Sequence, residues 1–322
     1  MKFVLSEEQR SLAEALDEII ESSGGTKIAR TWADGDTALG QVLWGQLAEL
    51  GLSGLCVPED DGGMGGTPVD LAVAFERLGY HAAPGPYIES AALLPDLVDA
   101  GVLGGILDGS AIATAAVPGL APYALDAVSS THSFLLTPDS LTPAVPGTAL
   151  GSIDRTRSLS PLSADGEPVA LDPAAAATAL DRAALACAAM LLGAGERLLE
   201  ESVSYAKIRE QFGRPVGEYQ GLKHQLANVR VALTFARPLL YGAALDLGGP
   251  DGPRSVSAAK VAVSDAADLA ARTALQVHGA IGYTEEHDLG LWFTKVRALI
   301  GAWGTPRHHR SRLASLLLTT GN

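Results

Sequence analysis

The chain contains 322 residues, of which 47% are hydrophobic, and its formal net charge is −14, from 23 lysines and arginines against 37 aspartates and glutamates. This length can bury a large core, as one multilayered unit or as two to three subdomains. The acidic balance argues against a nucleic-acid partner, because phosphate binding needs clustered lysine and arginine. The first residues become polar too early for a signal peptide, and no apolar run approaches the roughly 18 residues that cross a bilayer, so we expect a cytoplasmic protein without a membrane span.

Helical spacing of apolar residues dominates the first third of the chain. Ser6 precedes Glu8 and Gln9 and opens a helix whose apolar residues recur at helical spacing. Similar patterns, separated by breaks rich in glycine and proline, predict helices over 40–50, 68–79 and 86–100. We therefore expect this part to be all helical.

The pattern changes twice further along the chain. Short apolar runs at 111–117, 133–137 and 168–171, divided by proline, glycine, serine and aspartate, predict short strands within about 111–173. Long helices rich in alanine and leucine then return, at 174–208, 220–247, 255–278 and in an amphipathic tail over 289–318. We therefore predict a mainly α fold with a small β region. Its expected parts are an N-terminal helical domain (1–110), an abbreviated β domain (111–173) and a C-terminal helical bundle (174–322).

The segment 205–220 ends the first of these long helices with the sequence YAKIREQFGRPVGEYQ. Arg209 stands at the end of the helix, where a guanidinium can make a bidentate contact with a phosphate. Gly213 supplies a turn that ends the helix. The simpler interpretation of Arg209 is a surface arginine that neutralises the C-terminal end of the helix.

A second segment, 276–286, has the sequence QVHGAIGYTEE. Gln276, Gly279 and Gly282 lie where a helix passes into a turn, and the missing glycine side chains would let a ligand approach the backbone. A helix-ending glycine without any ligand is the alternative.

In this order and spacing, the two segments resemble the flavin-binding motifs of the acyl-CoA dehydrogenase family. The resemblance covers nearly the whole chain, including LSEEQ at 5–9. It implies the acyl-CoA dehydrogenase fold, in which a C-terminal four-helix bundle follows the middle β domain, and it implies FAD as the cofactor. The residues that match FAD-contacting positions of the family, with alanine in place of a usual glycine at 280, are Arg209, Gln211, Phe212, Gln220, Gln276, Gly279, Ala280 and Thr305.

The family's reaction removes an α-proton from an acyl thioester with a carboxylate and passes the β-hydride to the flavin. The resemblance places that carboxylate at Trp303 or at Ala183, and neither side chain can accept a proton. Asp181 faces another side of its helix, because two residues turn a helix by about 200°. Glu286 is the remaining candidate, although related sequences that carry an acid at this position do not use it as the base. We therefore expect no catalytic base in this chain.

The family's flavin-ring motif in the β domain, of the form T-E-P-x-x-G-S-D, is also missing. The segment 111–151 offers Pro118 and Gly119, and later Ser129, without the acid, proline and serine together. Our leading hypothesis is a subunit that completes the FAD site of a homologous catalytic acyl-CoA dehydrogenase subunit, in a heterotetramer whose partner holds most of the acyl-CoA. The alternatives are a self-sufficient homo-oligomeric enzyme with a relocated base and a non-redox scaffold of the same fold.

A cationic run near the C-terminus, 307–312, contains two histidines and three arginines. Adjacent histidines point to different sides of a helix, so we expect a solvated cationic helix end instead of a metal or phosphate site. Cys56 and Cys187 lack metal-ligand spacing and are expected to be reduced. No metal site is predicted.

Overall fold

A computed structural model of the chain describes residues 4–279 and 288–319. Its first part is helical, with the elements α1 Glu7–Ser22, α2 Thr26–Ala33, α3 Ala38–Glu49, the 3-10 turns η1 Leu52–Gly54 and η2 Glu59–Asp61, α4 Pro68–Tyr80, the π-helix η3 Ile88–Leu93 and α5 Ala100–Leu107. The prediction of a single helix over 86–100 is wrong, because the structure has η3 and then the start of α5 there. Pro95 lacks the N–H that a continuing helix needs. Asp99 caps α5 by accepting a hydrogen bond from the N–H of Gly101.

The second part carries short strands, namely β1 Ala113–Ala116, β2 Ala124–Leu125, β3 His132–Leu136, β4 Ser140–Pro146, β5 Leu159–Ser160, β6 Leu162–Ala164 and β7 Val169–Ala170. A five-stranded sheet has the order β1-β3-β4-β6, with β7 beside β4. Strands β1 and β3 are parallel, and β4 is antiparallel to β3 in the register Phe134 to Pro143. Strands β2 and β5 form a separate pair. The sequence pattern did not predict β4, because Pro143 and Pro146 interrupt it.

The third part contains α6 Pro173–Ile208, the hairpin strands β8 Glu210–Gln211 and β9 Arg214–Pro215, the 3-10 turn η4 Val216–Glu218, α7 Gln220–Asp246, α8 Gly252–His278, α9 Leu289–Gly301 and α10 Pro306–Thr319. The single tail helix expected over 289–318 is in fact two helices. The chain leaves the helical conformation at Ala302, where ψ is 147°, Gly304 has φ +94°, and Pro306 starts the next helix. The predicted order of helices, short strands and long helices is confirmed.

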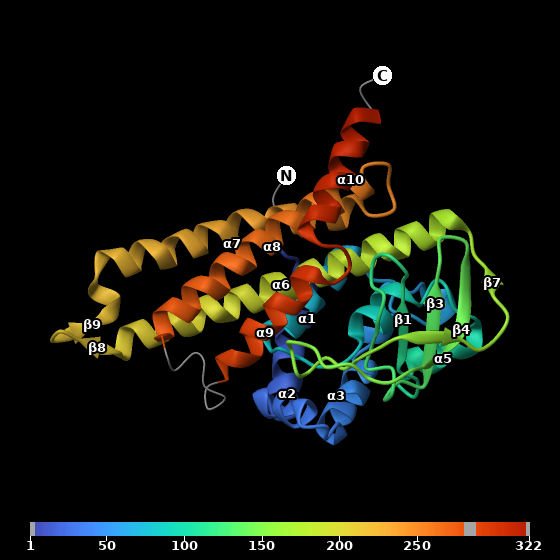
Figure 1. Ribbon diagram of the computed structural model, residues 1–322, viewed down its shortest axis with the longest axis horizontal. Helices are drawn as coiled ribbons and strands as arrows, with labels where there is room; N and C mark the ends of the chain where they lie inside the picture. The colour runs from blue at the N-terminus through green and yellow to red at the C-terminus, as the bar shows by residue number, and fades with distance from the viewer. Residues whose placement is uncertain (1–3, 280–287, 320–322) are drawn as a thin grey trace.

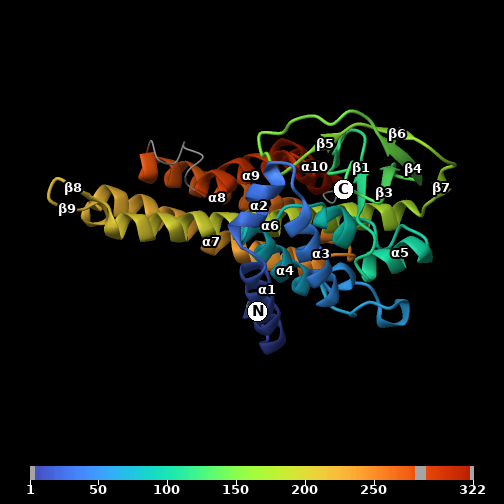
Figure 2. The same cartoon turned by 90° about the horizontal axis from the view of Figure 1, so that it is seen from below.

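Helix α6 is the central helix of the fold. Figures 1 and 2 show it running the length of the molecule, with the sheet near its N-terminal end and the β8–β9 hairpin at its C-terminal end. Contrary to expectation, this helix is long and apolar enough to cross a membrane, with a mean hydropathy of 1.5 in its most apolar stretch. However, 78% of that stretch is buried. Its apolar residues therefore form the core between α4, α7 and α8.

Glycines let α4 and α6 touch through their backbones. A Cβ atom added to Gly193 of α6 would lie 1.8 Å from the carbonyl oxygen of Glu76, and one added to Gly79 of α4 would lie 2.0 Å from that of Met190. No side chain fits at either position without a shift of the backbone. The two helices cross at this point because both carry glycine there.

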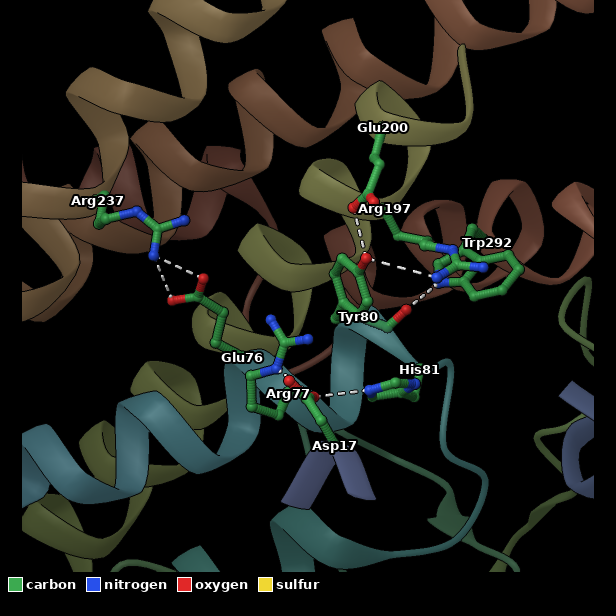
Figure 3. Close-up of polar contacts among 9 residues, drawn as sticks. All are labelled: Asp17, Glu76, Arg77, Tyr80, His81, Arg197, Glu200, Arg237 and Trp292. Atoms are coloured by element: carbon green, nitrogen blue, oxygen red, sulfur yellow. Dashed lines mark hydrogen bonds and ion pairs between the residues drawn. The ribbon is translucent and has the colours of Figure 1, made fainter. Parts of the chain in front are cut away.

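Polar side chains tie the N-terminal helices to the bundle, as Figure 3 shows. Glu76 of α4 accepts two hydrogen bonds from Nη1 of Arg237, at 2.6 and 2.9 Å, and a third from Tyr241 Oη at 3.2 Å. Tyr80 at the end of α4 donates from Oη to Glu200 at 2.5 Å. These contacts fix α4 against α6 and α7, which carry the site described next.

Candidate functional site

Several predicted cofactor residues gather at one end of the bundle. Figure 1 shows the end of α6, the β8–β9 hairpin and the start of α7 extending beyond α1, α2 and α3. A cavity of about 610 Å³ lies there, and we call it the arm cavity. Its wall consists of Tyr205, Arg209, Gln211, Val216, Gly221, Leu222, Gln225, Gln276, Val277, His278 and Gly279.

Arg209 has a fixed backbone and an available side chain. Its N–H donates to the carbonyl of Tyr205 at 2.9 Å, and its own carbonyl accepts from the N–H of Val216 at 2.7 Å. The side chain is exposed, and the guanidinium has no hydrogen-bond partner within 4–279 or 288–319. Five N–H donors are therefore free to bind an anion.

The start of α7 adds a second positive feature to the arm cavity. Tyr219 is the N-cap residue of α7, and its side chain does not cap the helix. The first N–H groups of a helix carry partial positive charge and suit an anion such as phosphate. Gly221, in the first turn of α7, lines the cavity together with Arg209. Both features, the free guanidinium and the uncapped helix start, have the charge that suits an anion.

The β8–β9 hairpin next to the cavity holds a strained aromatic residue. Phe212 has φ +54° and Gly213 has φ +81°, the pattern of a two-residue type I′ turn. The Phe212 side chain is 92% exposed. A non-glycine residue in the left-handed region costs on the order of 1–3 kcal/mol, and such strain is concentrated at functional sites. Arg214 stacks 4.1 Å from the centroid of the Tyr219 ring and so helps to hold the hairpin.

The end of α8 forms the opposite wall. The rings of Tyr205 and His278 lie 4.4 Å apart, and His278 Nδ1 donates to the carbonyl of Ala274 at 2.8 Å, since a carbonyl can only accept. Gly279 ends the helix with φ +60°, where a Cβ atom would meet nothing within 4 Å. The backbone conformation, and not crowding, therefore favours glycine at this position.

The other predicted site residues are placed differently. Phe212 extends from the hairpin tip into solvent, and Gln220 is exposed at the start of α7 beside the cavity wall. Thr305 lies in the turn between α9 and α10, away from the arm cavity. Ala280 and Glu286 lie outside the described residues, as do Gly282 and the rest of the second motif.

Sequence reasoning missed three residues of the wall, Gly221, Leu222 and Gln225, which all follow the first motif. Gln225 follows Gly221 by four residues on α7 and therefore lies on the same face of that helix. Helical spacing from the end of the first motif could have identified it.

The α9–α10 turn holds the position where the resemblance places a catalytic glutamate. Trp303 stands there, 2% exposed and with φ +54°. Its carbonyl accepts a hydrogen bond from His309 Nε2 at 3.0 Å, so Nδ1 of His309 accepts from Ser257 Oγ at 3.2 Å. Burial lowers the pKa of His309 to about 4, and the imidazole is therefore neutral at pH 7. Ala183, at the other position, is fully buried.

The prediction of a solvated cationic helix end over 307–312 is wrong for His309 and Arg312. His309 is buried and neutral, as described above. Arg312 makes a two-pronged ion pair with Asp181 of α6, whose side chain is 7% exposed. The sequence gives no local sign of this pair, because 131 residues separate its partners.

Comparisons with known proteins agree with this architecture. The family model "Acyl-CoA dehydrogenase, N-terminal domain" matches residues 6–101, and "Acyl-CoA dehydrogenase, C-terminal domain" matches residues 174–318. These segments leave 102–173 between them, the part that carries β1 to β7. Among solved structures, the ChsE4-ChsE5 complex from Mycobacterium tuberculosis matches with a TM-score of 0.86 at 21% identity, covering 99% of each chain. The Tcur3481-Tcur3483 steroid ACAD matches with a TM-score of 0.84 at 25% identity, covering 98% of this chain and 99% of that chain.

Two curated relatives match nearly end to end. Acyl-CoA dehydrogenase IpdE2 of Mycobacterium tuberculosis is 33% identical over 321 residues, covering 96% of this chain and 97% of that protein. The protein of the same name from Mycolicibacterium smegmatis is 30% identical over 315 residues, covering 96% of this chain and 98% of that protein. With its fold, its two matched domains and these full-length relatives, the chain belongs to the acyl-CoA dehydrogenase family.

Proposed function

We propose that this chain is a cytoplasmic subunit of an FAD-dependent acyl-CoA dehydrogenase, and that it completes the FAD site of a homologous catalytic subunit. The observation that carries the proposal is the arm cavity, which brings Arg209, Gln211, Gln276 and Gly279 together at an exposed end of the bundle. The other possible catalytic region, around Trp303, lies elsewhere and offers no base at that position.

The arm cavity fits the pyrophosphate half of FAD. Arg209 can bind two phosphate oxygens at once, and the uncapped start of α7 favours negative charge. Gln211 and Gln276 are exposed amides on the cavity wall that can donate or accept hydrogen bonds, and Phe212 offers an exposed ring beside them. Bound FAD would supply the hydride acceptor of the reaction. The residues of this chain would bind and orient its anionic half.

A partner subunit is supported by an exposed apolar face on α7. Val231, Phe235 and Leu239 follow one another at spacings of four residues and are 52%, 73% and 48% exposed. Exposed apolar faces of this kind commonly mark a protein–protein interface. Because the arm cavity lies at the start of the same helix, a subunit that packs on this face would also bring its cofactor towards Arg209. A heterotetramer of two such pairs is the assembly that we propose, with the acyl-CoA held mainly by the catalytic partner.

The test is to purify the chain alone and together with a homologous acyl-CoA dehydrogenase chain from the same genome, and to measure bound flavin by absorbance. We expect little or no FAD on the isolated chain and one FAD per heterodimer in the complex. Stoichiometric FAD on the isolated chain would instead support a homo-oligomer with a relocated base. A complex without flavin would support a scaffold.

Arg209→Gln tests the contact itself. Loss of a charge-assisted hydrogen bond is worth about 1.5–3 kcal/mol, so the FAD affinity of the complex should fall by roughly one to two orders of magnitude. Lys207→Gln is the matched control, because Lys207 is an exposed cation in the last turn of α6 that does not line the cavity. Equal losses in both variants would show a general charge effect and would contradict a direct contact.

A further inference from the structure

A second cavity, of about 440 Å³, lies near the N-terminal end of α6 and shares no residue with the arm cavity. We call it the turn cavity. Apolar side chains form much of its wall, with Val117 and Leu136 from the β domain, Leu180 and Ala184 from α6, and Trp303 from the α9–α10 turn. Its volume is in the range of pockets that hold small organic molecules.

Charged groups converge on one side of the turn cavity. Arg312 donates from Nη1 and Nη2 to the two carboxylate oxygens of Asp181, with Nη2 to Oδ2 at 2.9 Å, and its Nη1 lies 3.5 Å from Ser257 Oγ. A guanidinium carries five N–H donors, so this arrangement leaves some of them available. The Arg312 side chain is 30% exposed. His308 also lines the cavity from the first turn of α10, where the helix carries partial positive charge.

The wall around Trp303 is held rigidly. The Trp303 carbonyl is bonded to His309, and a Cβ atom on Gly304 would lie 2.5 Å from His309 Nε2. A preformed wall loses little conformational freedom when a ligand binds. An indole cannot take a proton from a substrate, so Trp303 provides an apolar surface and no base.

We propose that the turn cavity binds a compact, rigid, apolar molecule that carries one carboxylate. The apolar body lies against Trp303 and Leu180, and the carboxylate accepts from the remaining donors of Arg312 beside the start of α10. A neutral molecule of the same shape can accept the same hydrogen bonds, but it lacks the attraction between a carboxylate and the guanidinium. The site binds its ligand without chemical change, and it is independent of the arm cavity and of FAD.

The probe is adamantane-1-carboxylate, and adamantane-1-carboxamide is its neutral comparator. We expect isothermal titration calorimetry on the full chain to show at least tenfold tighter binding of the carboxylate. The chain has four tryptophans, so 5-fluorotryptophan labelling should give four fluorine resonances. The carboxylate should shift one of them, and that resonance should be missing from the Trp303→Phe variant.

Two variants locate the binding. Ala177→Phe places a large ring at an exposed position that lines the cavity and should abolish binding, whereas Ala174→Phe is exposed on the same helix outside the cavity wall and should not. The double change Asp181→Asn with Arg312→Gln removes both charges, and the carboxylate should then bind no more tightly than the carboxamide.

Three results would each overturn the proposal. They are equal binding of the two probes to the unaltered chain, no binding at millimolar concentration, and unchanged binding to the Ala177→Phe variant. FAD content of the two-chain complex should stay unchanged throughout, so failure here is distinct from failure of the proposed function.

Discussion

Replacing Arg237 with methionine should weaken the attachment of α4 to α7, because it leaves the Glu76 carboxylate buried without its ion-pair partner. The Glu76 side chain is 8% exposed, and Arg237 contacts it through Nη1 at 2.6 and 2.9 Å. Breaking a buried ion pair from one side costs about 3–5 kcal/mol. The Arg237 side chain is 33% exposed, so water replaces part of the lost contact and we expect a value near 3 kcal/mol.

The effect should depend on pH. Burial raises the pKa of Glu76, and the Arg237 guanidinium opposes that shift by favouring the carboxylate. Without Arg237 the folded-state pKa rises further above the unfolded value. A raised folded pKa gives stability that is present at low pH and is lost as the pH increases through it. The deficit of the Arg237→Met variant should therefore be larger at pH 8 than at pH 5.

Urea unfolding of both proteins at several pH values between 5 and 8 measures this deficit. Arg230→Met is the control, because Arg230 lies on the same helix and its side chain is 57% exposed in its pair with Glu196. That surface pair should contribute less than about 1 kcal/mol. Equal deficits for the two variants, or a deficit for Arg237→Met that does not change with pH, would refute the reasoning.

Three further changes test other parts of the structure. Gly304→Ala should lower the free energy of unfolding in urea by about 1–3 kcal/mol, because φ is +94° and the new Cβ would press on His309. Gly301→Ala is the control and should be close to neutral, since nothing lies within 4 Å of a Cβ there. Phe212→Asn should raise the unfolding free energy by up to about 1 kcal/mol, because asparagine tolerates a positive φ. The same change should lower the FAD content of the two-chain complex. A variant that is more stable but keeps its full FAD content would show that the Phe212 ring has no role in binding. Glu286→Gln should leave turnover of that complex within about tenfold, and a loss of about three orders of magnitude with flavin still bound would identify a base in this chain.

The long helices could be predicted because their information is local. Apolar periodicity indicated α6, α7 and α8 nearly to their observed ends, since each buries a stripe that repeats along the sequence. Strand β4 could not be predicted, because Pro143 and Pro146 are tolerated there only through the sheet that surrounds them. The buried state of His309 depends on Ser257, which lies 52 residues away in the sequence.

The same distinction applies to the candidate site. Arg209 and Gln276 could be identified because each lies within a short motif at the end of a helix. Their proximity in the arm cavity depends on the packing of α8 against α6, which no local pattern specifies. Thr305 shares a family resemblance with them, but its place beside the α9–α10 turn shows that a resemblance does not group residues into one cavity.

The length of α6 explains why such a subunit would need a partner. Asp181, beside the turn cavity, and Arg209, beside the arm cavity, are 28 positions apart on one helix, which is about 42 Å at 1.5 Å per residue. A cofactor whose ring and pyrophosphate are joined by a short chain of single bonds cannot reach from one cavity to the other. Under the proposed function, the arm cavity of this chain therefore serves a flavin ring that the catalytic partner holds. In the proposed complex, Gly304→Ala beside the turn cavity should then leave the FAD content unchanged, while Arg209→Gln in the arm cavity should lower it.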